Sequence, residues 1–149
     1  MFEKVVACLD GSSLAEQILP YTIEEAMHFN SKVVLLQVFT PPLPVLGGMV
    51  VADRLRAEIE EEENRIKTYL EGLAQPLRDK GLDVECVVLR GNPGEQIVTY
   101  AHENEVGLVA IAFHRRHGLA RVVFGSTADF VLKESHLPVL LVKPPGSEK

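Results

Sequence analysis

Five short apolar runs, separated by segments with helical periodicity, constrain the fold of this chain more than any other feature. Runs of this length that are apolar on both faces are typical of strands in a parallel sheet. Parallel strands need a crossover between them, and helical patterns fill the intervals. The sequence therefore predicts an α/β fold, with a five-stranded parallel sheet and helices on both of its faces. The five predicted strands are Val5–Leu9, Lys32–Phe39, Leu82–Leu89, Gly107–Ala112 and Val139–Val142.

The predicted helices begin and end at recognisable signals. Ser12 or Ser13, directly after the first strand, is a suitable N-cap for the first helix. A long helix is predicted over residues 51–80, where apolar residues recur at three-, four- and seven-residue steps. Pro76 is expected to kink or restart it. Two further helices are predicted, one after the turn at residues 91–94 and a short one over residues 126–134.

The composition describes an ordinary globular domain. The 149 residues fit a single domain, 1–149, and a hydrophobic content of 46% is enough for a sizeable core. A net charge of -6 argues against a nucleic-acid partner. We find neither an apolar stretch of about 20 residues, the length of a membrane span, nor a signal peptide, and therefore expect a cytoplasmic protein. The two cysteines, Cys8 and Cys86, lie in apolar runs and are expected to be reduced thiols.

Motifs of common enzyme classes are missing from the sequence. A Gly-x-Ser-x-Gly nucleophile elbow, a Walker lysine and a dinucleotide-binding Gly-x-Gly-x-x-Gly after the first strand do not occur. His114, His117 and His136 lack helical spacing and a fourth ligand, which argues against a metal site. We therefore expect a protein that is not an enzyme and that holds no metal.

One segment carries a family resemblance. Ala112-Phe113-His114-Arg115 is followed by nine residues and then by Gly125-Ser126. Together with residues 118–128 and 137–143, this pattern resembles the universal stress protein family, whose loop reads Gly-x-x-Gly, nine residues, Gly-(Ser/Thr). The resemblance covers essentially the whole chain. It implies the strand order 3-2-1-4-5 and a Rossmann-like fold of the adenine nucleotide alpha hydrolase type.

The resemblance also implies a ligand site. In this strand order the winding reverses between the first and fourth strands, so a crevice lies beyond their carboxyl ends. In the ATP-binding members of the family, the position of Asp10 holds the ribose hydroxyls, and those of Leu9 and the Val38 backbone lie beside the adenine. The remaining residues implied are those of the phosphate wall: Ile111, Ala112, His114, Arg115, Gly125, Ser126 and Thr127.

Two positions depart from the family pattern. Ala112 and Arg115 stand where the family has glycine, a residue that permits positive φ and lets the backbone approach phosphate closely. Arg115 must point away from the pocket, or enter it and bind phosphate through its guanidinium. The basic stretch His114 to Arg121 can equally be an exposed loop that balances the acidic long helix. These departures predict weak ATP binding at most.

Two functional hypotheses remain. The first is a non-catalytic stress-response module that acts through dimerisation and partner contacts and needs no nucleotide. The second is a sensor for ATP, AMP or another phosphate-bearing ligand, with the proline-rich segment 40–50 closing over it. Under both, the apolar edge strand predicts a homodimer, since such an edge invites pairing with another chain, and the family resemblance implies the same interface. Its residues are Val139, Leu140, Leu141 and Val142.

Overall fold

A five-stranded parallel sheet forms the centre of the molecule. The computed structural model of the protein describes residues 1–42, 49–113 and 125–143. The strand order is β3-β2-β1-β4-β5 and every neighbouring pair is parallel, which confirms the predicted topology. The strands are β1 (Lys4–Leu9), β2 (Lys32–Phe39), β3 (Val84–Arg90), β4 (Leu108–Ala112) and β5 (Val139–Val142).

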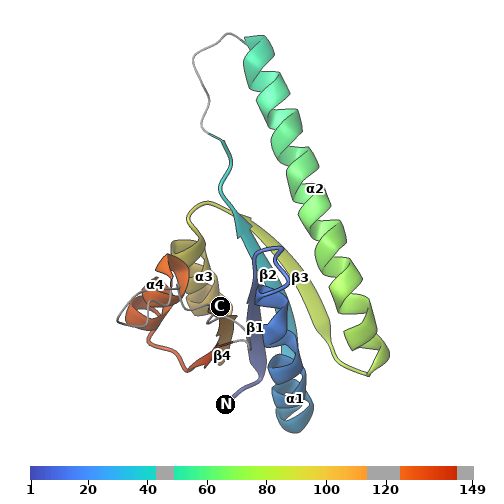
Figure 1. Cartoon of the computed structure of the whole chain (residues 1–149), viewed down its shortest axis with the longest axis vertical. Coiled ribbons are helices and arrows are strands. Elements are labelled where there is room, and N and C mark those ends of the chain that lie inside the picture. Colours follow the sequence, from blue (N-terminus) through green and yellow to red (C-terminus); the bar gives the residue numbers. More distant parts are fainter. Residues whose placement is uncertain (43–48, 114–124, 144–149) are drawn as a thin grey trace.

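Helices cover both faces of this sheet (Figure 1). The helices α1 and α2 pack on one face and α3 and α4 on the other, each pair over its own apolar core. Because β1 lies between these cores, its residues from Val5 to Leu9 are all buried. The elements are a 3-10 turn η1 (Ala15–Ile18) and the helices α1 (Leu19–Phe29), α2 (Met49–Asp79), α3 (Pro93–Glu103) and α4 (Ser126–Glu134).

The helix starts follow local polar contacts. Ser12, one of the two predicted caps, accepts a hydrogen bond from the Ala15 N–H through Oγ at 3.1 Å. This contact fixes the start of η1, while no side chain caps α1 itself. Asn92 accepts a hydrogen bond from the Glu95 N–H at 3.1 Å, and Pro93 occupies the first turn of α3. Both starts lie at the carboxyl ends of strands, where the crevice was predicted.

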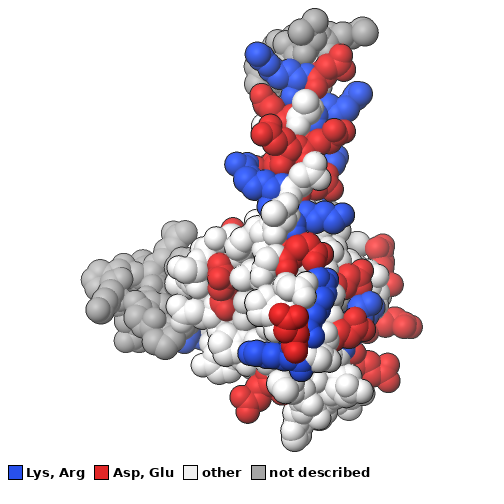
Figure 2. All heavy atoms as spheres, turned by 90° about the vertical axis from the view of Figure 1, so that its right-hand side faces the viewer, with Lys and Arg blue, Asp and Glu red and all other residues white. Residues whose placement is uncertain are grey.

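The helix α2 is longer than the sheet that it covers. Its 31 residues give a length of about 46 Å at 1.5 Å per residue. It continues through Pro76 to Asp79, so the predicted restart does not occur. The C-terminal half buries Ile66 and Leu70 against the sheet, whereas the N-terminal half extends beyond it (Figure 1). In Figure 2 this projecting part is covered with side chains of both charges.

The two cysteines are free thiols, as predicted; Cys8 is buried and Cys86 is half-buried. Within the described ranges, α2 and the shorter helices all fall short of the length and apolarity needed to cross a membrane. The segments 43–48, 114–124 and 144–149 lie outside the described residues.

Candidate functional site

A cavity of about 480 Å³ opens at the carboxyl ends of β1 and β4. Residues from the ends of β1, β2 and β4 and from the N-terminal turns of α3 and α4 form its walls. In this strand order, that is the point at which the winding of the sheet reverses. The volume is in the range of small-molecule sites in proteins. The fold therefore forms a cavity at the place where topology predicts a ligand crevice.

The structure brings most of the predicted site residues together around this cavity. His114 and Arg115 are the exceptions, because they lie outside the described residues. The same holds for His117 and Arg121, so the predicted basic loop is not described. The predicted residues that line the cavity are Leu9, Asp10, Val38, Ile111, Ala112, Gly125, Ser126 and Thr127.

The deeper walls of the cavity are apolar. Leu9 and Ile111 are 5% and 6% exposed, and Val38 is half-buried. Pro93 and Ile97 complete this wall from α3, and sequence reasoning missed both. The signal was present, since the turn at residues 91–94 follows a parallel strand and must therefore lie at the same edge of the sheet. The chemistry of these walls is suited to an apolar group.

Asp10 is held at the rim of the cavity by its own loop. Its Oδ1 accepts hydrogen bonds from the Ser12 N–H at 2.9 Å and from the Ser12 hydroxyl at 2.5 Å. Gly11, between them, has φ of +88°, a conformation that favours glycine. Asp10 is exposed, and its Oδ2 makes no hydrogen bond with the described part of the chain. One carboxylate oxygen thus positions the loop, and the other remains an acceptor for hydroxyl groups.

The N-terminus of α4 forms the opposite, polar end of the cavity. Gly125 precedes the helix with φ of 80° and ψ of 161°, a region open essentially to glycine alone. Ser126 and Thr127 follow in the first turn and line the cavity. The first N–H groups of a helix have no intrahelical acceptor and carry the positive end of its dipole. This end of the cavity is therefore suited to an anionic group.

Ala112 occupies one of the two positions at which the family pattern has glycine. It is half-buried at the end of β4, in register with Val142 of β5, and it lines the cavity. Among the described residues, those with positive φ do not include Ala112. Glycine is therefore not needed here for its backbone freedom. The remaining effect of the substitution is steric: one extra methyl group at the cavity wall.

Cys8 is the thiol that borders the cavity, and it is buried. Its burial raises the pKa from the ordinary 9.0 to about 12, because the thiolate would lose its hydration. This shift disfavours a thiolate nucleophile or thiolate ligand at neutral pH. The described residues also contain no group of three histidine, cysteine, aspartate or glutamate side chains placed to hold a metal.

The chain is similar in sequence and in fold to known proteins. The Methanocaldococcus jannaschii protein named universal stress protein MJ0531 is 28% identical over 153 aligned positions, which cover 99% of this chain and 86% of that protein. The solved structure of MJ0577 from the same organism superposes with a TM-score of 0.82 at 25% identity, covering 98% of this chain and 99% of the other.

Two more distant solved structures share the fold and contain nucleotides. One is a universal stress protein in complex with cAMP, with a TM-score of 0.70 at 20% identity over 95% of this chain and 97% of the other. The other is an Arabidopsis thaliana family protein with AMP bound, with a TM-score of 0.59 at 14% identity over 97% of each chain. The model of the universal stress protein family matches residues 1–143, and the chain belongs to this family.

Proposed function

We propose that this protein is a non-catalytic universal stress protein that binds an adenosine monophosphate, AMP or cAMP, in preference to ATP. The observation that carries the proposal is the cavity of about 480 Å³, with apolar walls at one end and a helix N-terminus at the other. Its existence favours a nucleotide-binding role over a module that works without a ligand. Relatives of the same fold with AMP and with cAMP bound support this ligand class.

Each part of a nucleoside monophosphate has a matching wall. The base would lie among Leu9, Val38 and Ile97, which line the apolar end. The ribose hydroxyls would donate to the free Oδ2 of Asp10, whose orientation the two contacts with Ser12 already fix. The phosphate would accept from the first N–H groups of α4. A preformed carboxylate costs little ordering on binding, which favours affinity.

The preference for a short phosphate chain follows from the altered glycine positions. A single phosphate at the N-terminus of α4 makes no demand on residues 112–115. The β- and γ-phosphates of ATP need backbone donors that approach closely, and Ala112 and Arg115 stand where the family pattern has glycine, the residue that permits such an approach. A binding role without catalysis agrees with the described walls, where Cys8 stays neutral and Asp10 is engaged with its own loop.

We further propose that two protomers associate through β5. On one side β5 pairs with β4, and the carbonyls of Pro138 and Val142 accept hydrogen bonds from that strand. Backbone groups alternate in direction along a strand, so those of Val139 and Leu141 point to the edge that no other described strand pairs with. An open edge with apolar side chains favours pairing with a second copy.

Calorimetric titration with AMP, cAMP and ATP-Mg tests the proposed ligand. We expect AMP or cAMP to bind at least about tenfold more tightly than ATP. Asp10→Asn keeps an oxygen that can accept from Ser12 but replaces the free acceptor with a donor. A lost hydrogen bond to a charged group, about 1.5–3 kcal/mol, should weaken binding roughly tenfold to a hundredfold. Asp83→Asn, the same change at an exposed site next to β3, should leave binding unchanged.

Two results would contradict the proposal. Tightest binding by ATP would show that the side chains at positions 112 and 115 do not exclude a triphosphate. If none of the three nucleotides gives a heat of binding, the alternative hypothesis, a stress-response module that needs no nucleotide, is favoured.

A further inference from the structure

The projecting half of α2 presents an apolar stripe that the rest of the protomer covers incompletely. Leu55 and Ile59 continue the face on which Ile66 and Leu70 are buried, but both are only half-buried. An isolated helical segment of this length is marginally stable in water, and most helical stability in proteins comes from packing of an apolar face. The described part of the chain supplies that packing to the C-terminal half of α2, and only in part to the projecting half.

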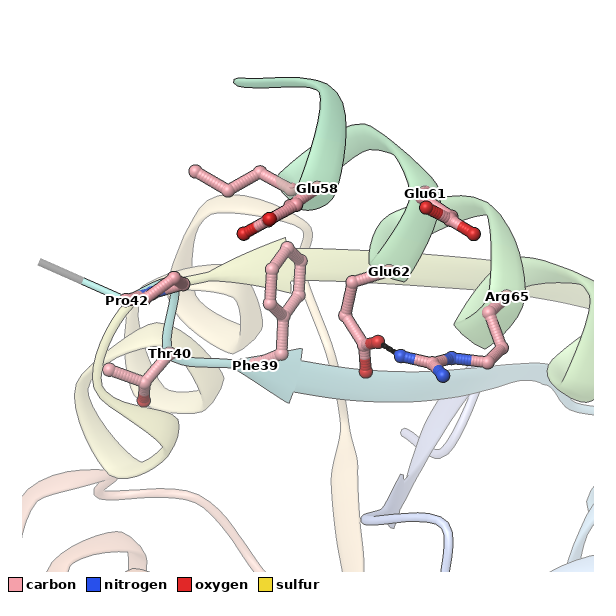
Figure 3. A pocket seen from close by; sticks show the side chains of 8 residues that line it. Phe39, Thr40, Pro42, Glu58, Glu61, Glu62 and Arg65 are labelled. Carbon is pink, nitrogen blue, oxygen red and sulfur yellow. Dashed lines mark ion pairs between the residues drawn. The ribbon is translucent and has the colours of Figure 1, made fainter. Parts of the chain in front are cut away.

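A groove runs along one side of this stripe. Its volume is about 460 Å³, and it lies between the end of β2 and the projecting part of α2 (Figure 3). Phe39 and Pro42 form one wall and Ile59 contributes an apolar surface from the helix. Thr40 also lines it, so the start of the 40–50 segment borders this groove and not the crevice at β1 and β4.

The helical wall of the groove is acidic. Glu58, Glu61 and Glu62 line it, and the one arginine there, Arg65, forms an ion pair with Glu62 (Figure 3). Within the described residues, Glu58 and Glu61 have no ion-pair partner. The groove therefore combines an apolar floor with two carboxylates that are available to a cationic group.

The complementary chemistry lies on the same helix, one turn towards its N-terminus. Leu55 is flanked by Arg54 and Arg56, and the described residues offer neither arginine an ion pair. No acidic residue occupies the first turn of α2. Leu55 with its two flanking arginines is therefore complementary, in charge and in polarity, to an apolar groove with an acidic wall.

Helical spacing places these charges in rows. Arg54, Glu58, Glu61 and Arg65 follow one another at four- and three-residue steps, so they form one row beside the stripe, and all of them except Arg54 line the groove. Arg65 is already paired with Glu62, so within the described residues each row offers an unpaired cation followed by two unpaired carboxylates. Two copies of this row match when the helices run antiparallel, because the basic end of each then meets the acidic part of the other. A parallel pair would place like charges together.

We propose that the projecting half of α2 docks antiparallel on the same segment of a second copy of this chain. Leu55 of each copy packs on Phe39 and Ile59 of the other, and Arg54 of each pairs with Glu58 and Glu61 of the other. The contact is isologous, so both grooves are filled by one twofold arrangement. This surface is separate from the open edge of β5, and the proposal does not rest on nucleotide binding.

A charge-exchange experiment tests the docking. Arg54→Glu leaves only acidic side chains at the three unpaired positions of the row, and the double variant Glu58→Arg/Glu61→Arg leaves only basic ones. Sedimentation velocity over a range of concentrations compares wild type, each variant alone and an equimolar mixture of the two. Lys80→Glu, the same charge change at an exposed position just beyond the other end of α2, is the matched control. Circular dichroism verifies that each variant keeps its helix content.

We expect wild type and Lys80→Glu to self-associate with the same dissociation constant. Either groove variant alone should raise that constant at least about tenfold, because like charges across an interface oppose association. The equimolar mixture should restore the association, and 0.5 M NaCl should weaken it through screening. The proposal is overturned if Arg54→Glu leaves the association of the wild type unchanged. It is equally overturned if the mixture fails to restore what the single variants lose, as expected if the groove binds an unrelated protein.

Discussion

At the scale of single residues, Asp10 and Gly125 lie at the two ends of the crevice, one acting through its side chain and the other through its backbone. Asp10 acts through hydrogen bonds, because one oxygen holds the Ser12 loop and the other stays free. Gly125 acts through its backbone, whose φ of 80° and ψ of 161° set the direction in which α4 starts. The first turn of α4, which begins directly after this residue, lines the cavity.

Substitution of Gly125 tests this backbone role. A Cβ at Gly125 would meet no atom of the described residues within 4 Å, so the expected cost comes from the backbone conformation. We expect Gly125→Ala to lower the free energy of unfolding by about 1–3 kcal/mol, measured by urea denaturation. Gly72→Ala is the control, because its Cβ would also meet nothing within 4 Å but the residue is helical. That change should raise stability by about 0.5–1 kcal/mol. Equal effects of the two changes would contradict a special backbone role of Gly125.

Sequence reasoning identified the residues of the crevice with uneven success. Asp10 and Gly125 were predictable because Asp10 directly follows a strand and Gly125 precedes a helix at the same edge of the sheet, whereas Leu9 was implied by the family resemblance. The turn before Pro93 and Ile97 follows a parallel strand, which indicates the correct edge of the sheet, but β3 is not adjacent to β1, so this signal alone does not place the two residues in the crevice. Their position depends on how α3 crosses the sheet, and periodicity does not give that geometry.

At the scale of elements, α2 combines a buried half with a projecting half. The apolar periodicity predicted residues 51–80, and the helix spans Met49–Asp79. Pro76 did not restart it as expected. Proline interrupts the hydrogen bond to the residue four positions earlier, here Gly72, and the following turn still packs through the buried Leu77. Burial of the last turn thus outweighed the local preference of proline.

The buried half of α2 should carry most of its contribution to stability. Leu70 is fully buried in the core between α2 and the sheet. Leu70→Ala should lower the free energy of unfolding by about 2–5 kcal/mol, through lost burial and the cavity left behind. Thr68→Ala, at an exposed position on the same helix, should change it by less than about 0.5 kcal/mol. Chemical denaturation of both variants gives the comparison, and a loss below about 1 kcal/mol for Leu70→Ala would contradict the packing described here.

At the scale of the whole molecule, the sheet order determines both the crevice and the open edge. The order was implied by the family resemblance, and the composition of the strands supported it at one edge. In β3, Glu85 is exposed whereas Val84 is buried, as the polar and apolar alternation predicted. The strand β5 is apolar throughout and pairs with β4 on one side. This apolar edge is the feature from which we propose a dimer.

The proposed β5 dimer has a test that isolates the backbone. Leu141→Pro removes an N–H that points to the open edge, and the bonds from β4 to Pro138 and Val142 remain. Leu141→Ala removes the same side chain but keeps that N–H. Light scattering after size exclusion should show that the alanine variant keeps the β5 association and the proline variant loses it. Retention of the dimer by the proline variant would exclude strand pairing at this edge.

The central claim is that an adenosine monophosphate lies in the crevice with its phosphate at the N-terminus of α4. A titration of the 15N-labelled protein with AMP, followed by amide chemical shifts, tests this claim most directly. We predict that the amides of Ser126, Thr127 and Ala128 shift, together with that of Gly11 in the loop held by Asp10, while those of α2 residues 66–77 stay unchanged. Saturating AMP without shifts at the start of α4, or with shifts confined to other surfaces, would contradict it.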